Sequence, residues 1–318
     1  LFSSFTLLWS PTMTPTVLVI LAVFWGLISL AILKVLFAFF GRKVSFLYFF
    51  PLAIIVYFGI PVLEDNMSRT LEAQNTVKLS EWEANQCVSP DVIRRSAFIV
   101  TNAQRRGHGT GFLLEGGIIG TNRHVYNAFG EDAVFIDSEG NAQTQTLAHV
   151  ADPKNGPDLA FYRMTTEMQG MRALPIATEA PRVGEQLLIV GQNFRRERFY
   201  ASVVDYRGYG DSMMDAPIGK LSPITIASMI PVGIYHRINN PDSLVDSGGM
   251  GTPVYAVHGD VFPGNSGSAV VNCAGEVVGV HYAGRGFIMF AFEHMGYAVA
   301  LDALNAELDK IPAEEPAE

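Results

Sequence analysis

Three short segments carry side chains that could act together in one reaction. The first, GHGTGFLLEGGIIGTNRHV, ends at His124 and Val125, the second, NGPDLAFYRM, contains Asp158, and the third, FPGNSGSAVVN, contains Ser266. A serine hydroxyl is a weak nucleophile until a base removes its proton, and an imidazole with a pKa near neutrality suits that role. A buried carboxylate would fix the imidazole tautomer and stabilise its charged form. The set therefore predicts acyl transfer through a serine.

The elements that must position these residues are predicted to be short strands. Runs rich in β-branched and aromatic residues alternate with Gly, Asn, Asp and Pro, as is typical of an all-β barrel or sandwich. These runs are AFIVT (97–101), GTGFLLE (109–115), AVFID (133–137), DLAFYRM (158–164), QLLIVG (186–191), SAVVN (268–272), EVVGVHYAG (276–284) and FIMFAF (287–292). A helix is expected near the C-terminus, where leucines follow helical spacing at Leu301, Leu304 and Leu308.

The order His, Asp, Ser, with the segments TNRH, DLA and GNSGS, resembles the chymotrypsin-like (trypsin-fold) serine proteases. The bacterial branch, with its glutamyl endopeptidases and HtrA-type proteases, is the most similar. The resemblance covers roughly residues 95–305. It implies two six-stranded β-barrels, at about 95–180 and about 184–300, with the active site in the cleft between them and a C-terminal helix behind. It also implies a protein or peptide substrate, and no cofactor or metal is expected.

The family motifs imply a role for each matching residue. His124 is the expected general base, Asp158 the orienting carboxylate and Ser266 the nucleophile. The N–H groups of Gly264 and Ser266 are the expected oxyanion hole, where losing one donor typically lowers the rate about 100- to 1000-fold. A catalytically silent scaffold with the same fold, serving as a subunit of a membrane complex, is the alternative function. The irregular segment 205–251 is longer than expected there and could be a lid, an oligomer contact or a partner-binding arm.

Two residues bear on specificity through the same resemblance. His281 lies in GVHYAG, fifteen residues after Ser266, and glutamyl endopeptidases and viral chymotrypsin-like main proteases carry a histidine there that binds Glu or Gln at P1, the residue before the scissile bond. The alternative is a strand histidine that only packs or meets solvent. Asp260, six residues before Ser266, is a competing sign, because trypsin-like enzymes use an aspartate at this offset to select Arg or Lys. Glu or Gln at P1 ranks first and a basic residue second.

The two cysteines, Cys87 and Cys273, either pair or remain two free thiols. A bridge would fasten the segment before the first barrel to the second barrel, and it would require an oxidising compartment.

A transmembrane hairpin is predicted over residues 1–63, with spans at about 16–40 and 44–63. Each run is long enough to cross a hydrocarbon core of about 30 Å at about 1.5 Å per residue. A buried soluble helical hairpin is the alternative. Residues 64–94 are expected to be a linker or a short helix, and residues 306–318 a tail.

Three cations at the turn, Lys34, Arg42 and Lys43, place that turn in the cytoplasm by the positive-inside tendency. The catalytic domain is then extracytoplasmic, in the periplasm if the membrane is a bacterial inner membrane. The lipid bilayer and other membrane-complex subunits are thus expected partners. The hydrophobic fraction of 49% excludes a disordered chain, and the net charge of −9 argues against nucleic-acid binding.

Overall fold

The computed structural model describes residues 69–102, 108–165, 170–192, 199–211, 252–261, 264–285 and 295–312. The two predicted spans, most of the segment 205–251 and the end of the predicted tail lie outside these residues. Among the described residues, no helix is both long enough and apolar enough to cross a membrane. The transmembrane hairpin therefore stays a prediction.

The first sheet is antiparallel and contains β1 (Ala97–Thr101), β2 (Gly109–Leu114), β3 (Ile118–Thr121), β4 (Val134–Ile136), β5 (Ala142–Thr144), β6 (Thr146–Val150) and β7 (Ala160–Arg163). Its seven strands lie in the order β5-β4-β1-β2-β3-β7-β6. Only Gln145 separates the two edge strands along the chain, so the sheet must curl until its edges approach each other. The expected closed six-stranded barrel is thus corrected to a curled seven-stranded sheet in the described part of the chain.

The second sheet is a closed barrel built from β8 (Gln186–Gln192), β9 (Phe199–Gly210), β10 (Val254–His258), β11 (Ala269–Val271), β12 (Val277–Arg285) and β13 (Met295–Ala300). The six strands lie in the order β10-β13-β12-β11-β8-β9, which confirms the predicted six-stranded barrel. The irregular segment predicted from Asp205 begins later than expected, because β9 continues to Gly210 where it pairs with β10.

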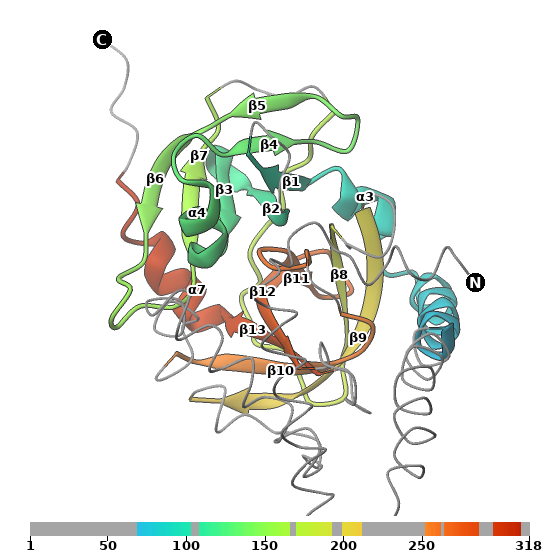
Figure 1. The fold of residues 1–318 in the computed structure, drawn as a ribbon. Helices are drawn as coiled ribbons and strands as arrows, with labels where there is room; N and C mark the ends of the chain where they lie inside the picture. Colours follow the sequence, from blue (N-terminus) through green and yellow to red (C-terminus); the bar gives the residue numbers. More distant parts are fainter. Residues whose placement is uncertain are drawn as a thin grey trace, which may run out of the picture.

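Three apolar clusters form the core of the described residues. One lies within the first sheet and includes Phe98, Phe135 and Tyr162. A second lies within the barrel and includes Leu187, Tyr255 and Val270. The largest joins both sheets and includes Phe112, Phe161, Leu188, Val190 and Val277. The first sheet therefore packs on the barrel, and Figure 1 shows β1–β7 above the barrel strands. Residues at the junction contact both sheets.

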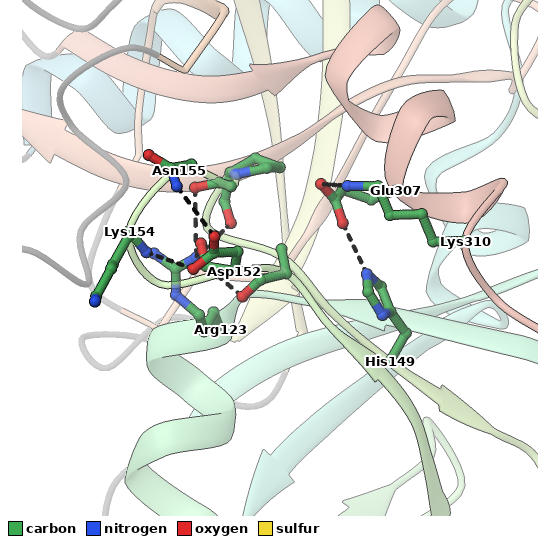
Figure 2. Close-up of polar contacts among 10 residues, drawn as sticks. Arg123, His149, Asp152, Lys154, Asn155, Glu307 and Lys310 are labelled. Carbon is green, nitrogen blue, oxygen red and sulfur yellow. Dashed lines mark hydrogen bonds and ion pairs between the residues drawn. The ribbon is translucent and has the colours of Figure 1, made fainter.

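Helices connect and cover the sheets. They are α3 (Pro90–Arg94), α4 (Arg123–Phe129), the short 3-10 helix Glu115–Gly117 and α7 (Leu301–Leu308), and residues 69–84 are also helical. The predicted C-terminal helix is thus confirmed as α7. It follows the barrel strand β13, yet its buried Glu307 lies 2.7 Å from His149 of β6 and 2.7 Å from Lys310 (Figure 2). This contact ties the C-terminal helix to the first sheet.

The helix through residues 69–84 is fastened to the barrel rather than left as a free linker. Trp82 is 1% exposed and donates from Nε1 to the Val88 carbonyl at 2.7 Å. Cys87 and Cys273 form a disulfide, which decides between the two alternatives that the sequence left open. Val88 also donates from its N–H to the Cys273 carbonyl at 2.8 Å. The segment before the first strand is therefore part of the folded domain.

Candidate active site

His124 and Asp158 form a hydrogen-bonded pair. His124 lies in the first turn of α4, and Asp158 lies in the loop between β6 and β7. Asp158 Oδ2 is 2.5 Å from His124 Nδ1, and Asp158 Oδ1 accepts from the His124 main-chain N–H at 2.9 Å. The carboxylate side chain is 1% exposed, whereas the imidazole is 37% exposed. A buried acid thus orients a partly exposed imidazole ring through its Nδ1.

The two residues before His124 hold the loop that presents Asp158. Asn122 donates from Nδ2 to the Asp158 carbonyl at 2.9 Å. The Arg123 guanidinium is buried, and its Nη1 is 2.9 Å from the carbonyls of both Asp152 and Pro157 (Figure 2). It also approaches two further carbonyls of the same loop, those of Ala151 at 3.3 Å and Gly156 at 3.4 Å. Arg123 therefore links the start of α4 to the whole loop before the acid.

Ser266 lies in the serine loop, the name used here for residues 259–268, which connects β10 to β11. Thr110 of β2 holds this loop at two points, because its N–H donates to the Ser266 carbonyl at 2.7 Å and its Oγ1 donates to the Gly264 carbonyl at 2.7 Å. The Thr110 carbonyl in turn accepts from Thr121 Oγ1 at 2.6 Å. The first sheet thus binds the serine loop directly through Thr110. The partner of Thr110, Thr121, lies three residues before His124.

Glycine is required at two positions of the serine loop. Gly267 has φ +87°, and a Cβ there would overlap the Thr110 carbonyl oxygen. Gly264 has φ +99°, and a Cβ there would lie 2.7 Å from the Gln192 carbonyl oxygen. Within the described residues, the N–H groups of Gly264 and Ser266 donate no hydrogen bond. Two neighbouring N–H groups without a protein partner could donate to an anionic oxygen.

The Ser266 hydroxyl points to the barrel. Its Oγ donates to the Tyr282 carbonyl at 3.3 Å, and within the described residues it makes no hydrogen bond to His124. The two segments are nevertheless neighbours, because a Cβ on Gly109, beside Thr110, would lie 2.7 Å from Val125, beside His124. Hydrogen bonds of catalytic groups are often long before substrate binds. Rotation of one side-chain torsion would redirect the hydroxyl.

His281 lies beside the serine loop with its ring buried. It is 2% exposed, and its carbonyl accepts from the Gly267 N–H at 2.8 Å. Burial lowers the pKa of His281 to about 4, an effect that the main chain of Asn265 partly offsets and the charge on His124 strengthens. Neither ring nitrogen reaches a hydrogen bond of normal geometry in the described structure. His281 is therefore a neutral imidazole with unused hydrogen-bonding capacity.

Asp260 occupies a different environment. It is 2% exposed, and its Oδ2 accepts from the Tyr200 hydroxyl at 2.6 Å. This carboxylate oxygen is thus already bonded to a side chain from β9. The structure brings His124 and Asp158 into contact and places Ser266 and His281 on adjacent segments, whereas Asp260 is committed to a neighbour that the sequence did not identify.

Sequence reasoning did not single out Arg123, Thr110 or Tyr200. The sequence marked Arg123 and Thr110 only as polar residues inside the segments TNRH and GTG. It gave no indication of a role for Tyr200. Each acts through contacts with distant segments, as the separation of 154 residues between Thr110 and Gly264 shows. No group of three or more His, Cys, Asp or Glu side chains in the described ranges is arranged to hold a metal ion.

The chain is similar to known peptidases in sequence and in fold. A family model described as trypsin-like peptidase domain matches residues 109–280, more than half of the chain. No curated protein sequence matches. Similar solved structures include the inactive form of Rv3671c protease, with 18% identity, a TM-score of 0.49 and coverage of 70% of this chain and 92% of that chain. The serine endoprotease from Yersinia pestis has 19% identity, a TM-score of 0.47 and coverage of 70% of this chain and 66% of that chain.

Proposed function

The chain belongs to the trypsin-like peptidase domain family, and from that premise we propose that it is a membrane-anchored serine endopeptidase. The observation that carries this proposal is the buried carboxylate of Asp158, bonded to both the ring and the main chain of His124. An aspartate in this position selects the imidazole tautomer that leaves Nε2 as a base, and it stabilises the imidazolium formed during reaction.

The proposed reaction is peptide-bond hydrolysis through an acyl-enzyme. Ser266 Oγ bonds to the scissile carbonyl carbon while its proton passes to His124 Nε2, and the carbonyl electrons move to oxygen. The free N–H groups of Gly264 and Ser266 receive that oxyanion. His124 then gives its proton to the leaving amine as the C–N bond breaks. A water molecule repeats the sequence, releasing the acid and restoring the serine.

The second candidate function is a catalytically silent scaffold in a membrane complex. The observation that favours it is the Ser266 hydroxyl, which bonds to the Tyr282 carbonyl rather than to His124 in the described structure. A scaffold needs the fold but not the hydroxyl–imidazole contact. The two candidates differ in whether the serine can be activated.

Labelling with a fluorophosphonate probe separates these candidates. We expect the folded full-length chain to form a covalent adduct, and Ser266→Ala and His124→Ala to form none, because the probe requires an activated serine. Peptide hydrolysis by the same three proteins should follow the labelling. A wild-type protein that neither labels nor hydrolyses peptides would favour the scaffold, and equal labelling of Ser266→Ala would reject Ser266 as the nucleophile.

For specificity, we propose that His281 binds Glu or Gln at P1. A neutral imidazole can donate a hydrogen bond to either side chain, and the His281 ring nitrogens lack partners of normal geometry. Gly296 lies directly beside this ring, because a Cβ there would lie 3.0 Å from His281 Nε2. Selection of Arg or Lys by Asp260 ranks second, since its Oδ2 is engaged by the Tyr200 hydroxyl.

A peptide-library cleavage profile tests this assignment. We expect His281→Ala to lower kcat/KM for Glu and Gln at P1 by about 100-fold or more, because a site built to bond a polar side chain discriminates strongly. Asp260→Asn should preserve the preference for Glu or Gln. Ser266→Ala controls for contaminating peptidases, and an unchanged P1 profile in His281→Ala would reject the assignment.

We also propose that two spans, at about 16–40 and 44–63, anchor the domain on the extracytoplasmic side of a membrane. The runs 16–33 and 44–63, which carry no charged residue, and the cations Lys34, Arg42 and Lys43 support this topology. A disulfide in the folded domain agrees with an oxidising compartment. Protease protection of membrane vesicles, combined with extraction at alkaline pH, tests both parts. Release by alkali would reject the spans, and protection in right-side-out vesicles would reject the orientation.

A further inference from the structure

One stretch of β9 has no strand paired to its outer edge within the described part of the chain. The pairing of β9 with β10 covers residues 205–210 and starts where His258 faces Asp205. Among the described residues, the strand that pairs with residues 199–204 is β8 alone. An uncovered edge exposes main-chain N–H and C=O groups that need partners when they are buried.

Asn75, on the helix through residues 69–84, occupies this edge. Its Oδ1 accepts from the Val203 N–H at 2.9 Å, and its Nδ2 donates to the Ala201 carbonyl at 2.9 Å. Asn75 is 3% exposed. A carboxamide has the same donor and acceptor as a peptide group, so Asn75 takes the place of the missing strand at two residues of β9.

The same amide begins a chain of hydrogen bonds to the serine loop. Asn75 Nδ2 donates to the Tyr200 hydroxyl at 2.9 Å, and the Tyr200 hydroxyl donates to Asp260 Oδ2 at 2.6 Å. A phenol has one hydrogen, so accepting from the amide leaves that hydrogen for the carboxylate. Hydrogen bonds to an ionised acceptor are shorter and stronger than neutral ones. The direction of the chain is therefore set from helix to loop.

Asp260 lies six residues before Ser266, at the beginning of the serine loop, whereas Thr110 holds the loop at Gly264 and Ser266. We propose that Asn75 and Tyr200 are positioning residues, which hold the start of the serine loop through Asp260. The helix that supplies Asn75 lies outside the matched residues 109–280. A segment before the family domain thereby helps to set the place of the nucleophile.

The predicted effect on kcat rests on the proposed peptidase function. The predicted effect on the position of the serine loop does not depend on that function. Tyr200→Phe is the sharpest variant, because it removes one oxygen and leaves the bonds of Asn75 to β9 intact. Asn75→Ala removes both the edge bonds and the chain. Lys78→Met is the matched control, since Lys78 lies one turn along the same helix and bonds to Asp205 at 3.0 Å rather than to Asp260.

Hydrogen–deuterium exchange of residues 259–268 in the full-length chain is the first measurement. We expect Tyr200→Phe and Asn75→Ala to accelerate exchange there about tenfold, as the loss of one charged hydrogen bond predicts. Lys78→Met should leave the exchange rate of the serine loop unchanged. The double variant Asn75→Ala with Tyr200→Phe should exchange no faster in this loop than Asn75→Ala alone, because the two residues act in series.

Kinetics of peptide hydrolysis are the second measurement. We expect Tyr200→Phe to lower kcat about tenfold or more while KM changes less than about threefold, because misplacing a reacting group affects the chemical step. Unchanged loop exchange in Tyr200→Phe overturns the inference, as does unchanged kcat in an active enzyme. If the wild type proves inactive while loop exchange still responds to Tyr200→Phe, the proposed function fails and the positioning chain stands.

Discussion

Asp158 holds His124 at two points, with Oδ2 at 2.5 Å from the ring Nδ1 and Oδ1 at 2.9 Å from the main-chain nitrogen. One oxygen fixes the ring and the other fixes the helix turn that carries it. The imidazole therefore keeps its orientation without substrate, and in the proposed reaction a hydrogen on Nδ1 would make Nε2 the base. The remaining adjustment before reaction falls on the Ser266 side chain.

The loop that presents Asp158 should lose stability when the buried guanidinium of Arg123 is removed. We expect Arg123→Met to lower the free energy of unfolding by about 2 to 4 kcal/mol, because several buried carbonyls lose a charged donor. Arg123→Lys should recover only part of this loss, since the lysine side chain is shorter and lacks the planar guanidinium that places Nη1 2.9 Å from the carbonyls of both Asp152 and Pro157. Urea unfolding measures the stability, and the pH profile of kcat/KM reports on the orientation of His124.

Lys154→Met is the control for that prediction. Lys154 is an exposed cation in the same loop, so its loss should change stability by less than about 0.5 kcal/mol. If Arg123→Met proves as stable and active as Lys154→Met, the buried guanidinium does not organise the loop.

Gly267→Ala should disrupt the serine loop severely. Its Cβ would overlap the Thr110 carbonyl and Thr121 Oγ1, and the backbone conformation at φ +87° disfavours any L side chain. We expect a stability loss of about 3 kcal/mol or more together with loss of fluorophosphonate labelling. Gly140→Ala, at φ +97° with open space around the new Cβ, should cost about 1 to 2 kcal/mol and leave labelling intact. Equal effects of the two variants on labelling would contradict this account.

His281 should make the folded protein sensitive to mild acid. Its pKa is about 4 when folded, below the ordinary value of 6.5, so folding excludes a proton that the unfolded chain would bind. The free energy of unfolding is therefore unaffected by this group above pH 6.5. It decreases as the pH falls toward about 4, by up to about 3 kcal/mol. His281→Gln cannot titrate and should lose less stability over the same range. Urea unfolding at about pH 7 and about pH 4.5 measures the difference, and parallel losses would show that His281 does not titrate.

Reducing the disulfide should destabilise the domain. Cys87 and Cys273 are separated by 186 residues, so the bridge restricts a long loop of the unfolded chain. We expect a reductant to lower the free energy of unfolding by about 2 to 5 kcal/mol. The double variant Cys87→Ser with Cys273→Ser should unfold with the reduced stability and show no response to reductant. A response in that variant would indicate that the reductant acts elsewhere.

Much of the architecture was predictable because it depends on local patterns. Apolar runs such as 97–101 and 186–191 became β1 and β8, and the leucines from Leu301 became α7. The first barrel was predicted incorrectly in its detail, because strand number and closure depend on which edges meet. The short strands β5 and β6, divided only by Gln145, carry too few apolar residues to be recognised from sequence.

The candidate site was predictable in its residue types and less so in its contacts. The motifs located His124, Asp158 and Ser266, since a reaction demands particular side chains in family-like segments. Nothing in the order of residues revealed that Asp260 would bond to Tyr200, 60 residues away. The direction of the Ser266 hydroxyl was equally inaccessible, because a side-chain torsion responds to neighbours that only packing assembles.

By itself the amino-acid sequence determined most of the strands along the chain, the glycines of the serine loop and the residue types proposed for acyl transfer, all of which follow from short-range sterics and side-chain chemistry. Tertiary structure alone decided the partners: Arg123 with the loop before Asp158, Thr110 with the serine loop, and Asn75 with the uncovered edge of β9. The physical reason is that a buried polar group bonds to whichever partner the folded chain brings within reach. The distance between two such groups cannot be read from either local segment.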